Sequence, residues 1–266
     1  MSLTFCSLYS GSSGNATYIA SGKTGILVDA GLSGRQMTEA LARIGVLPET
    51  LSGIVITHEH SDHVKGAGIL SRKYHVPVYA NERTWEAMAS QVGAVAPGEK
   101  RVFETDGDFY IGDLSLHAFP IPHDAADPVG FRVWGGGRSA ATATDMGYVR
   151  KDVLRALAGA DLVLLESNHD PQLLMNNPHY SAALKRRILG QHGHLSNEAC
   201  ANGILALYES GVRRLVLGHL SAENNTPNLA METALQAVTC QGLTPNEDIG
   251  LDLGWRDHPG QVYELS

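Results

Sequence analysis

A run of histidines and carboxylates at residues 58–63 (HEHSDH) constrains this chain more than any other feature of its sequence. The run follows directly on an apolar stretch that we expect to be a buried strand, and it precedes a stretch with helical spacing. In an extended segment His58 and His60 point the same way, whereas Asp62 and His63 come after the turn and reach a second position nearby. Imidazole nitrogens and carboxylate oxygens are ligands of Zn²⁺, Mn²⁺ and Fe²⁺. The pattern therefore predicts a metal site where a strand ends.

The alternative interpretation is a polar loop that happens to contain histidines. The chain has 12 histidines among 266 residues. At that frequency chance would produce this spacing in roughly one such chain in a thousand. We therefore interpret the run as a set of ligands. The histidines outside any such pattern are expected to lie at the surface or to be satisfied in the core: His75, His117, His179, His192 and His258.

The overall composition is that of an ordinary folded domain, with 43% hydrophobic and 18% charged residues. The formal net charge of −8 argues against binding nucleic acid through a broad basic surface, but it leaves room for a local basic patch. The 266 residues suffice for a large core. We find no linker and no low-complexity stretch, so residues 1–266 are expected to form a single metal-binding domain.

The cysteines and the N-terminal sequence bear on where the protein works. Cys6, Cys200 and Cys240 are odd in number and widely spaced, which argues against disulfides and favours core cysteines in a reducing compartment. No positively charged, apolar leader precedes Lys23, and no stretch approaches about 18 apolar residues. We therefore expect a soluble, cytoplasmic protein without membrane association.

The elements predicted from hydrophobic periodicity fall into two similar halves, residues 2–89 and residues 102–238. Each half begins with strands and ends with alternating strands and helices. Strands are expected at residues 3–8, 17–20, 24–28, 51–57, 77–80, 162–166 and 215–218, and as a run with glycine turns from 101 to 143. Helices are expected at residues 36–44, 62–74, 83–89, 151–158, 173–189 with a break at Pro178, 197–208 and 229–238. This order predicts two sheets with helices outside them, a layered α/β sandwich.

Residues 58–63 also resemble a known signature. The pattern H-x-H-x-D-H after a strand is similar to that of the metallo-β-lactamase fold superfamily, whose members carry further ligands downstream. Three residues lie in the matching order, each after a predicted strand: His123, Asp145 and His219. The resemblance covers most of the chain, and it implies a four-layer αββα sandwich with its site at one edge.

This resemblance implies a site for two divalent metal ions, with Zn²⁺ as the default, Mn²⁺ common among the nucleases, and Fe²⁺ also compatible with the ligands. The implied ligands are, for one ion, His58, His60 and His123; for the other, Asp62, His63 and His219; and as the bridge, Asp145. Asp62 is also counted among the catalytic residues. Paired ions activate water and stabilise charge on a phosphoryl oxygen, so the site suits hydrolysis of phosphodiesters.

Glu166 and His194 match a second pattern. Glu166 ends a predicted strand and His194 precedes a predicted helix, in the order of the glutamate–histidine dyad of the tRNA 3′-processing endonucleases of this fold. The resemblance implies that His194 donates a proton to the leaving oxygen and that Glu166 orients and charges it. Two alternatives stay open. In the first, Glu166 and His194 have structural roles only, beside the helix cap Ser196. In the second, His192 is the donor.

Longer stretches resemble the YycJ (WalJ) family of bacterial proteins, among them residues 7–15 (SLYSGSSGN), 166–170 (ESNHD) and 219–225 (HLSAENN). That family is regarded as a 5′→3′ exonuclease acting on double-stranded DNA. The resemblance therefore implies a DNA end as the partner of this protein.

Two stretches are candidates for contact with such a substrate. Ser12, Ser13 and Asn15 lie in a glycine-rich loop that could bind a phosphate, and a plain turn fits the same residues equally well. The basic run at residues 185–187 (KRR) could contact a DNA backbone or form a solvated helix face. A short, local contact of this kind would suit an exonuclease that grips an end.

The sequence thus predicts a dinuclear metal hydrolase that acts on phosphodiesters, with DNA exonuclease as the leading function. The first alternative is a phosphodiesterase for a small diester, such as a cyclic nucleotide or a phosphonate-pathway ester. A second is a signalling accessory protein with a vestigial site. The complete set of implied ligands argues against the second, because an inactive relative is expected to have lost at least one of them.

Overall fold

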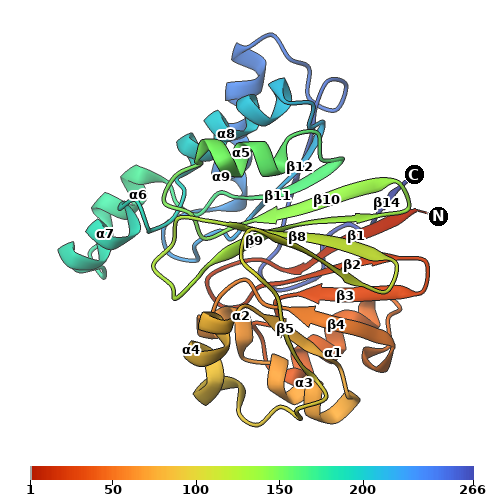
Figure 1. Ribbon diagram of the computed structural model, residues 1–266. Coiled ribbons are helices and arrows are strands. Elements are labelled where there is room, and N and C mark those ends of the chain that lie inside the picture. The colour runs from red at the N-terminus through yellow and green to blue at the C-terminus, as the bar shows by residue number, and fades with distance from the viewer. Residues whose placement is uncertain (1) are drawn as a thin grey trace.

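The computed structural model describes residues 2–266, in which two β-sheets lie face to face with helices on both outer sides (Figure 1). The predicted four-layer αββα sandwich is confirmed. The first sheet has the order β14-β1-β2-β3-β4-β5-β6. Its strands are β1 (Leu3–Tyr9), β2 (Ala16–Ser21), β3 (Thr24–Val28), β4 (Leu51–Val55), β5 (Val78–Ala80), β6 (Lys100–Val102) and β14 (Tyr263–Leu265).

The second sheet has the order β13-β12-β11-β10-β9-β8-β7. Its strands are β7 (Gly107–Ile111), β8 (Leu114–Pro120), β9 (Val129–Gly135), β10 (Arg138–Ala143), β11 (Leu162–Glu166), β12 (Arg214–Gly218) and β13 (Gly250–Leu253). The first half of the chain thus builds most of one sheet and the second half builds the other, as the element order predicts.

Helices cover the outer face of each sheet (Figure 1). The first sheet is covered by α1 (Gly34–Arg43), α2 (Ser61–Val64), α3 (Ala67–Tyr74) and α4 (Glu82–Val92). The second is covered by α5 (Lys151–Leu157), α8 (Asn197–Glu209) and α9 (Pro227–Cys240), while α6 (Pro171–Asn176) and α7 (Ala182–Ile188) project from the body. No helix within residues 2–266 combines the length and the apolar character that crossing a membrane requires.

Alternation along the strands divides the core into three layers. On β1, Leu3 and Phe5 pack between the two sheets, whereas Cys6 and Leu8 pack beneath the helices of the first sheet. Successive side chains of a strand point to opposite faces, so one strand contributes to two cores. The apolar layer between the sheets fixes their relative position, and it thereby brings the ends of strands from both halves to one edge.

The helix predicted over residues 62–74 is divided into α2 and α3. The break lies at Gly66, whose N–H donates to the carbonyl of Ala30 at 2.7 Å. A side chain at this position would place its Cβ 2.4 Å from the carbonyl oxygen of Leu32. The loop after β3 crosses the helix here, and only a glycine permits so close an approach.

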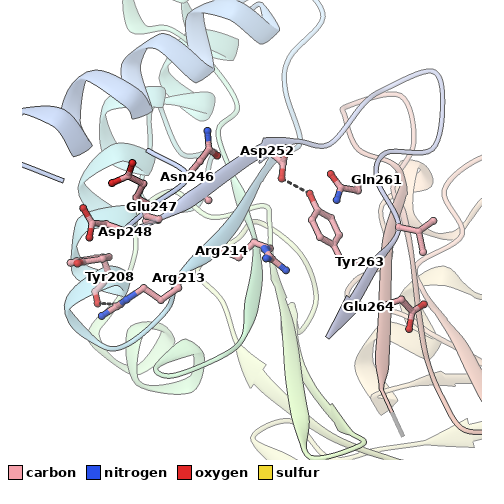
Figure 2. A pocket seen from close by; sticks show the side chains of 13 residues that line it. Tyr208, Arg213, Arg214, Asn246, Glu247, Asp248, Asp252, Gln261, Tyr263 and Glu264 are labelled. Carbon is pink, nitrogen blue, oxygen red and sulfur yellow. Dashed lines mark hydrogen bonds between the residues drawn. The ribbon is translucent and has the colours of Figure 1, made fainter. Parts of the chain in front are cut away.

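Two short strands near the end of the sequence were not predicted. β13 pairs with β12, and β14 pairs with β1 in antiparallel register. The Tyr263 hydroxyl on β14 donates to Asp252 on β13 at 2.7 Å, which joins the edges of the two sheets (Figure 2). Burial and the Asp252 carboxylate raise the pKa of Tyr263, so its hydroxyl stays protonated as the donor. Both strands are too short to show a hydrophobic periodicity in the sequence. They form because they pair with β12 and β1, which are distant in the sequence.

The three cysteines are free thiols. Cys6 and Cys200 are buried, as expected of core cysteines, but Cys240 at the end of α9 is exposed. The expectation that all three lie in the core was therefore wrong for Cys240. The last turn of α9 turns this residue away from the sheet.

Candidate metal centre

The implied ligands lie just beyond the carboxyl ends of strands and meet at one edge of the sandwich. His58 follows β4, His123 follows β8, Asp145 follows β10 and His219 follows β12. All four side chains are buried. The two sheets pack face to face, and this brings the ligand from the first sheet beside the three from the second.

Three histidines form the first group. His58 Nε2 lies 3.1 Å from His60 Nδ1, which lies 3.3 Å from His123 Nε2. A tetrahedral zinc ion with Zn–N bonds of about 2.0–2.1 Å separates neighbouring ligand nitrogens by about 3.3–3.4 Å. The three nitrogens therefore have the spacing of ligands around one ion.

A second group faces the first across Asp145. His63 Nε2 lies 3.5 Å from Asp62 Oδ2 and 3.4 Å from Asp145 Oδ2, and His219 Nε2 lies 3.7 Å from Asp62 Oδ2. The other oxygen of Asp145, Oδ1, lies 3.8 Å from His123 Nε2 of the first group. Oδ1 also lies 3.4 Å from His219 Nδ1, so the Asp145 carboxylate sits between the two groups and contacts both, as a bridging ligand must.

Two atoms of the second group have no hydrogen-bond partner in the described chain, although both are buried: Asp145 Oδ2 and His219 Nε2. A buried polar atom without a partner is costly. Both atoms belong to sets of imidazole nitrogens and carboxylate oxygens close enough to share an ion. The residues present therefore fit divalent metal ions.

Each buried histidine of the cluster has its second ring nitrogen fixed. His63 Nδ1 donates to Asp29 Oδ2 at 2.8 Å, and His58 Nδ1 lies 3.0 Å from the Thr57 hydroxyl, which itself donates to Asp29. His123 Nδ1 donates to the carbonyl of His192 at 3.1 Å. With a proton on each Nδ1, each Nε2 carries the lone pair that a metal needs, as in metal-bound histidines with an outer partner, although Asn15 Nδ2 lies 3.1 Å from that of His63.

Asp29 is a residue that sequence reasoning did not assign to the site. It follows β3 and accepts from the backbone N–H of Thr57 at 2.9 Å as well as from His63. Its only signal in the sequence is a carboxylate directly after an apolar strand. The contact with His63 arises because β3 and β4 are parallel neighbours, so their carboxyl ends meet.

The electrostatics favour neutral rings at His58 and His123 in the first group and positive charge at His63 and His219 in the second. Burial, with the rings of His63, His123 and His60 close by, holds the pKa of His58 well below its ordinary value. In the second group burial acts to lower the pKa of His219, but surrounding carboxylates, Asp145 first, raise it to about 10. A region that retains protons so strongly also attracts cations.

Backbone strain is concentrated at this edge. Asp29, Asp145 and His219 all have positive φ angles, of 62°, 63° and 55°. Few residues other than glycine adopt this left-handed conformation, and Asp and His are among those that do so most often. Such strain persists where the surrounding structure fixes it, and here it turns three strand ends toward one point.

Glu166 and His194 are in direct contact. His194 Nδ1 donates to Glu166 Oε1 at 2.8 Å, as a glutamate–histidine dyad requires. Glu166 Oε1 also accepts from His219 Nδ1 at 2.9 Å, and Oε2 accepts from the N–H of Met146 at 2.7 Å. Glu166 therefore orients an implied metal ligand and His194 together. Its side chain is fully buried, whereas that of His194 is 22% exposed and reaches the surface.

The candidate phosphate loop divides into two parts. Ser12 and Ser13 are exposed at its tip. Asn15 is buried, with Nδ2 3.3 Å from Asp62 Oδ2 and 3.1 Å from His63 Nε2, while Oδ1 accepts from the N–H of Gly11. The polar atoms of Asn15 are thus engaged inside the protein, and its side chain supports the second group.

A cavity of about 610 Å³ lies elsewhere, between the start of β12, the strand β13 and the segment that leads into β14 (Figure 2). Arg213 and Arg214 line it at the amino end of β12, whereas His219 follows the carboxyl end. Acidic side chains, among them Asp248 and Glu264, also line it. It is therefore separate from the metal centre.

Comparison with known proteins identifies the class. The sequence matches the family described as the β-lactamase superfamily domain over residues 24–220. With two facing sheets and a histidine–aspartate cluster at one edge, the chain belongs to this superfamily and has the metallo-β-lactamase fold. A crystal structure of the metallo-β-lactamase fold protein YhfI from Bacillus subtilis matches 99% of this chain and 100% of that one, with a TM-score of 0.73 at 16% identity.

Two relatives are far closer in sequence. Exodeoxyribonuclease WalJ of Streptococcus pneumoniae serotype 2 (strain D39 / NCTC 7466) is 43% identical over 261 residues, which cover 97% of this chain and 93% of WalJ. Exodeoxyribonuclease YycJ of Bacillus anthracis is 40% identical over 248 residues, which cover 93% of each chain. The resemblance to the WalJ/YycJ branch, stated from short motifs, is confirmed over nearly the full length.

Proposed function

We propose that this protein is a metal-dependent exonuclease that digests double-stranded DNA in the 5′→3′ direction. One observation carries the proposal. All of the implied histidine and aspartate ligands lie together in one cluster, and the relatives that match nearly the whole chain are named exodeoxyribonucleases. Free thiols fit a reducing compartment, and we assign the protein to the cytoplasm.

Two ions are proposed, with Zn²⁺, Mn²⁺ or Fe²⁺ compatible with the ligands. His58, His60 and His123 hold one, Asp62, His63 and His219 hold the other, and Asp145 bridges them. When bound, such ions activate water and offset the negative charge that develops on the phosphoryl group. The protein contributes the geometry, because Asp29, Thr57 and Glu166 fix the ligand rings before substrate arrives.

His194 is assigned as the proton donor to the leaving 3′ oxygen. Burial acts to lower its pKa, but the carboxylates of Glu166 and Asp145 outweigh burial and raise the pKa above the ordinary value. A raised pKa keeps more of the imidazolium form at neutral pH. Because Nδ1 donates to Glu166, the proton available for transfer is on Nε2.

The helix α7 projects from the body of the protein (Figure 1), and its basic run supplies a candidate contact with DNA. Two residues of its basic run are engaged within the protein: Lys185 donates to the carbonyl of Met175, and Arg187 pairs with Asp124 beside His123. Arg186 is exposed and has no ion pair in the described structure. The run thus offers one free cation to a phosphate, which fits a short footprint at a DNA end.

Removal of the ions is expected to lower the stability of the fold. Without cations, the buried carboxylates of Asp145 and Glu166 lie in one group and repel each other. Metal at about 100 times its Kd is expected to raise the free energy of unfolding by about 2.7 kcal/mol over the EDTA-treated protein. Thermal denaturation with EDTA or Mn²⁺ measures this. A melting temperature unaffected by metal would contradict a buried ligand set.

The activity is tested on a linear duplex with Mn²⁺ present, labelled at the 5′ end in one reaction and at the 3′ end in another. Early release of labelled mononucleotide is expected from the 5′-labelled duplex alone, with wild-type protein. Asp145→Asn is expected to release none, and Asp108→Ala, which changes an exposed carboxylate on β7, serves as the control.

Other outcomes would change the proposed polarity, the proposed substrate or the proposed function itself. Early release from the 3′-labelled duplex would reverse the polarity. If neither duplex is digested but bis(p-nitrophenyl) phosphate is hydrolysed, the site is a phosphodiesterase for small diesters. If neither substrate is cleaved by metal-loaded protein, the proposed hydrolase function is wrong.

A further inference from the structure

A cavity of about 340 Å³ lies beside the segment that carries His219, whose backbone N–H donates to the Ser10 hydroxyl at 2.7 Å. Leu220, which directly follows His219, lines one side, and Ser13, from the loop that carries Asn15, lines another. The rest of the wall comes from the start of α9 and from the segment after β13: Pro227, Leu253, Gly254, Trp255, Arg256 and Asp257. Ligand pockets span about 300–1,000 Å³, so this cavity has room for one small group and none for a duplex.

The segment that carries Trp255 is fixed to both sheets. The N–H of Ser10 donates to the carbonyl of Trp255 at 2.8 Å, and the N–H of Gly254 donates to the carbonyl of Leu217 at 2.8 Å. The indole stacks on His258, with ring centres 5.1 Å apart and an interplanar angle of 21°. Trp255 therefore forms a rigid aromatic wall. Because the side chain is already fixed, it loses little conformational freedom when a ligand packs against it.

Arg256 supplies a positive charge to the same cavity. It forms no ion pair or side-chain hydrogen bond within residues 2–266, because the neighbouring carboxylate of Asp257 is paired with His258 Nδ1 at 2.7 Å. The stem of Arg256 lies against Gly11, where a Cβ would come within 2.5 Å of its Cγ. The Asp257 carboxylate also lines the cavity, but its hydrogen bond goes to His258, so the N–H groups of Arg256 remain available to an anionic ligand.

The cavity lies mostly outside the part of the chain that the superfamily shares. The family match ends at residue 220 and begins at residue 24. Ser13, Pro227, Trp255 and Arg256 all fall beyond those limits. Most of the cavity wall therefore comes from segments outside the matched region.

We propose that this cavity binds the nucleoside next to the scissile phosphodiester. The base lies against Trp255, and an adjoining phosphate lies on Arg256. This proposal rests on the proposed exonuclease function. Aromatic side chains stack on any base, and arginine pairs with phosphate oxygens through several N–H groups. Leu220, Leu253 and Pro227 exclude water around the base. Because the cavity admits one nucleoside, it favours an unpaired terminal nucleotide over the interior of a duplex.

Binding of deoxyadenosine 5′-monophosphate and of deoxyadenosine to metal-loaded protein tests this directly by calorimetry. Trp255→Leu is expected to weaken both ligands by about 5- to 150-fold, the range for loss of one stacked base, whereas Trp255→Phe keeps most of the affinity. Arg256→Gln is expected to weaken the monophosphate more than the nucleoside, and Arg256→Lys to restore part of the difference. Arg35→Gln, an equal charge change on α1, is the control and is expected to bind as wild type does.

The outcomes distinguish a failure of the cavity proposal from a failure of the proposed exonuclease function. If wild-type protein binds the nucleotide, and both variants weaken it, but no DNA is digested, the cavity stands and the proposed function fails. If DNA is digested and neither Trp255→Leu nor Arg256→Gln changes the Kd of the nucleotide or the KM for DNA, the cavity proposal fails. Absence of nucleotide binding to folded, metal-loaded wild type also overturns it. Metal content and melting temperature of each variant establish that it is folded.

Discussion

Asp145→Asn is expected to lose tightly bound metal and to lower the rate of DNA digestion by at least about 10³-fold, which corresponds to about 4 kcal/mol of transition-state stabilisation. The Asp145 carboxylate sits between the first and second groups of ligands and contacts both, so removing the charge weakens both ion sites at once. Metal content by mass spectrometry and initial rates on the 5′-labelled duplex measure the two effects.

Asparagine is preferred to alanine in this test because of the backbone. Asp145 has a φ of 63°, a conformation that asparagine adopts more readily than alanine. Asp145→Ala adds strain to the loss of charge, so a difference in melting temperature between the two variants isolates the backbone contribution. Retention of two ions per chain at a wild-type rate would refute the bridging role.

His194→Ala is expected to keep both ions and to lower the turnover of DNA by about 10²–10⁴-fold. His194 is the member of the dyad that can be changed cleanly, because Glu166 also orients His219 and its removal would disturb the metal site. Metal content and kcat on DNA, measured on the same preparation, separate loss of the donor from loss of the ions.

The leaving group gives this prediction a second readout. p-Nitrophenolate departs without a proton, so bis(p-nitrophenyl) phosphate is expected to lose much less rate than DNA in His194→Ala. An equal loss on both substrates would argue that His194 positions the ligands and does not donate. His192→Ala is the matched control, since the His192 side chain is exposed and only its carbonyl contacts His123. A selective loss in that variant would transfer the donor role to His192.

The sequence was most informative where residues of one site are neighbours in the chain. His58, His60, Asp62 and His63 lie within one turn after a strand, and their spacing alone indicated ligands. The later members of the cluster are separated by long intervals, and only the order known from the superfamily linked them to residues 58–63. The fold followed from the alternation of strands and helices, since this pattern admits few layered arrangements.

Contacts that depend on sheet pairing could not be predicted from the sequence. Asp29 and His63 are 34 positions apart, and they meet because β3 lies parallel to β4. Asn15 resembled a substrate contact in its loop, yet its side chain turns inward to Asp62. No pattern in the sequence pointed to Trp255 and Arg256. They follow β13, which has four residues and forms only because it pairs with β12.

The pairing of β1 with β14 has a consequence for the newborn polypeptide. β1 emerges from the ribosome among the first segments, but its outer neighbour, Tyr263–Leu265, emerges after every other strand. Until then the hydrogen-bonding edge of Leu3–Phe5 is exposed, and an open strand edge invites association with other chains. His219 and the wall around Trp255 also arrive late. The nascent chain therefore has neither the full set of implied ligands nor a covered β1 edge until these late segments have been made.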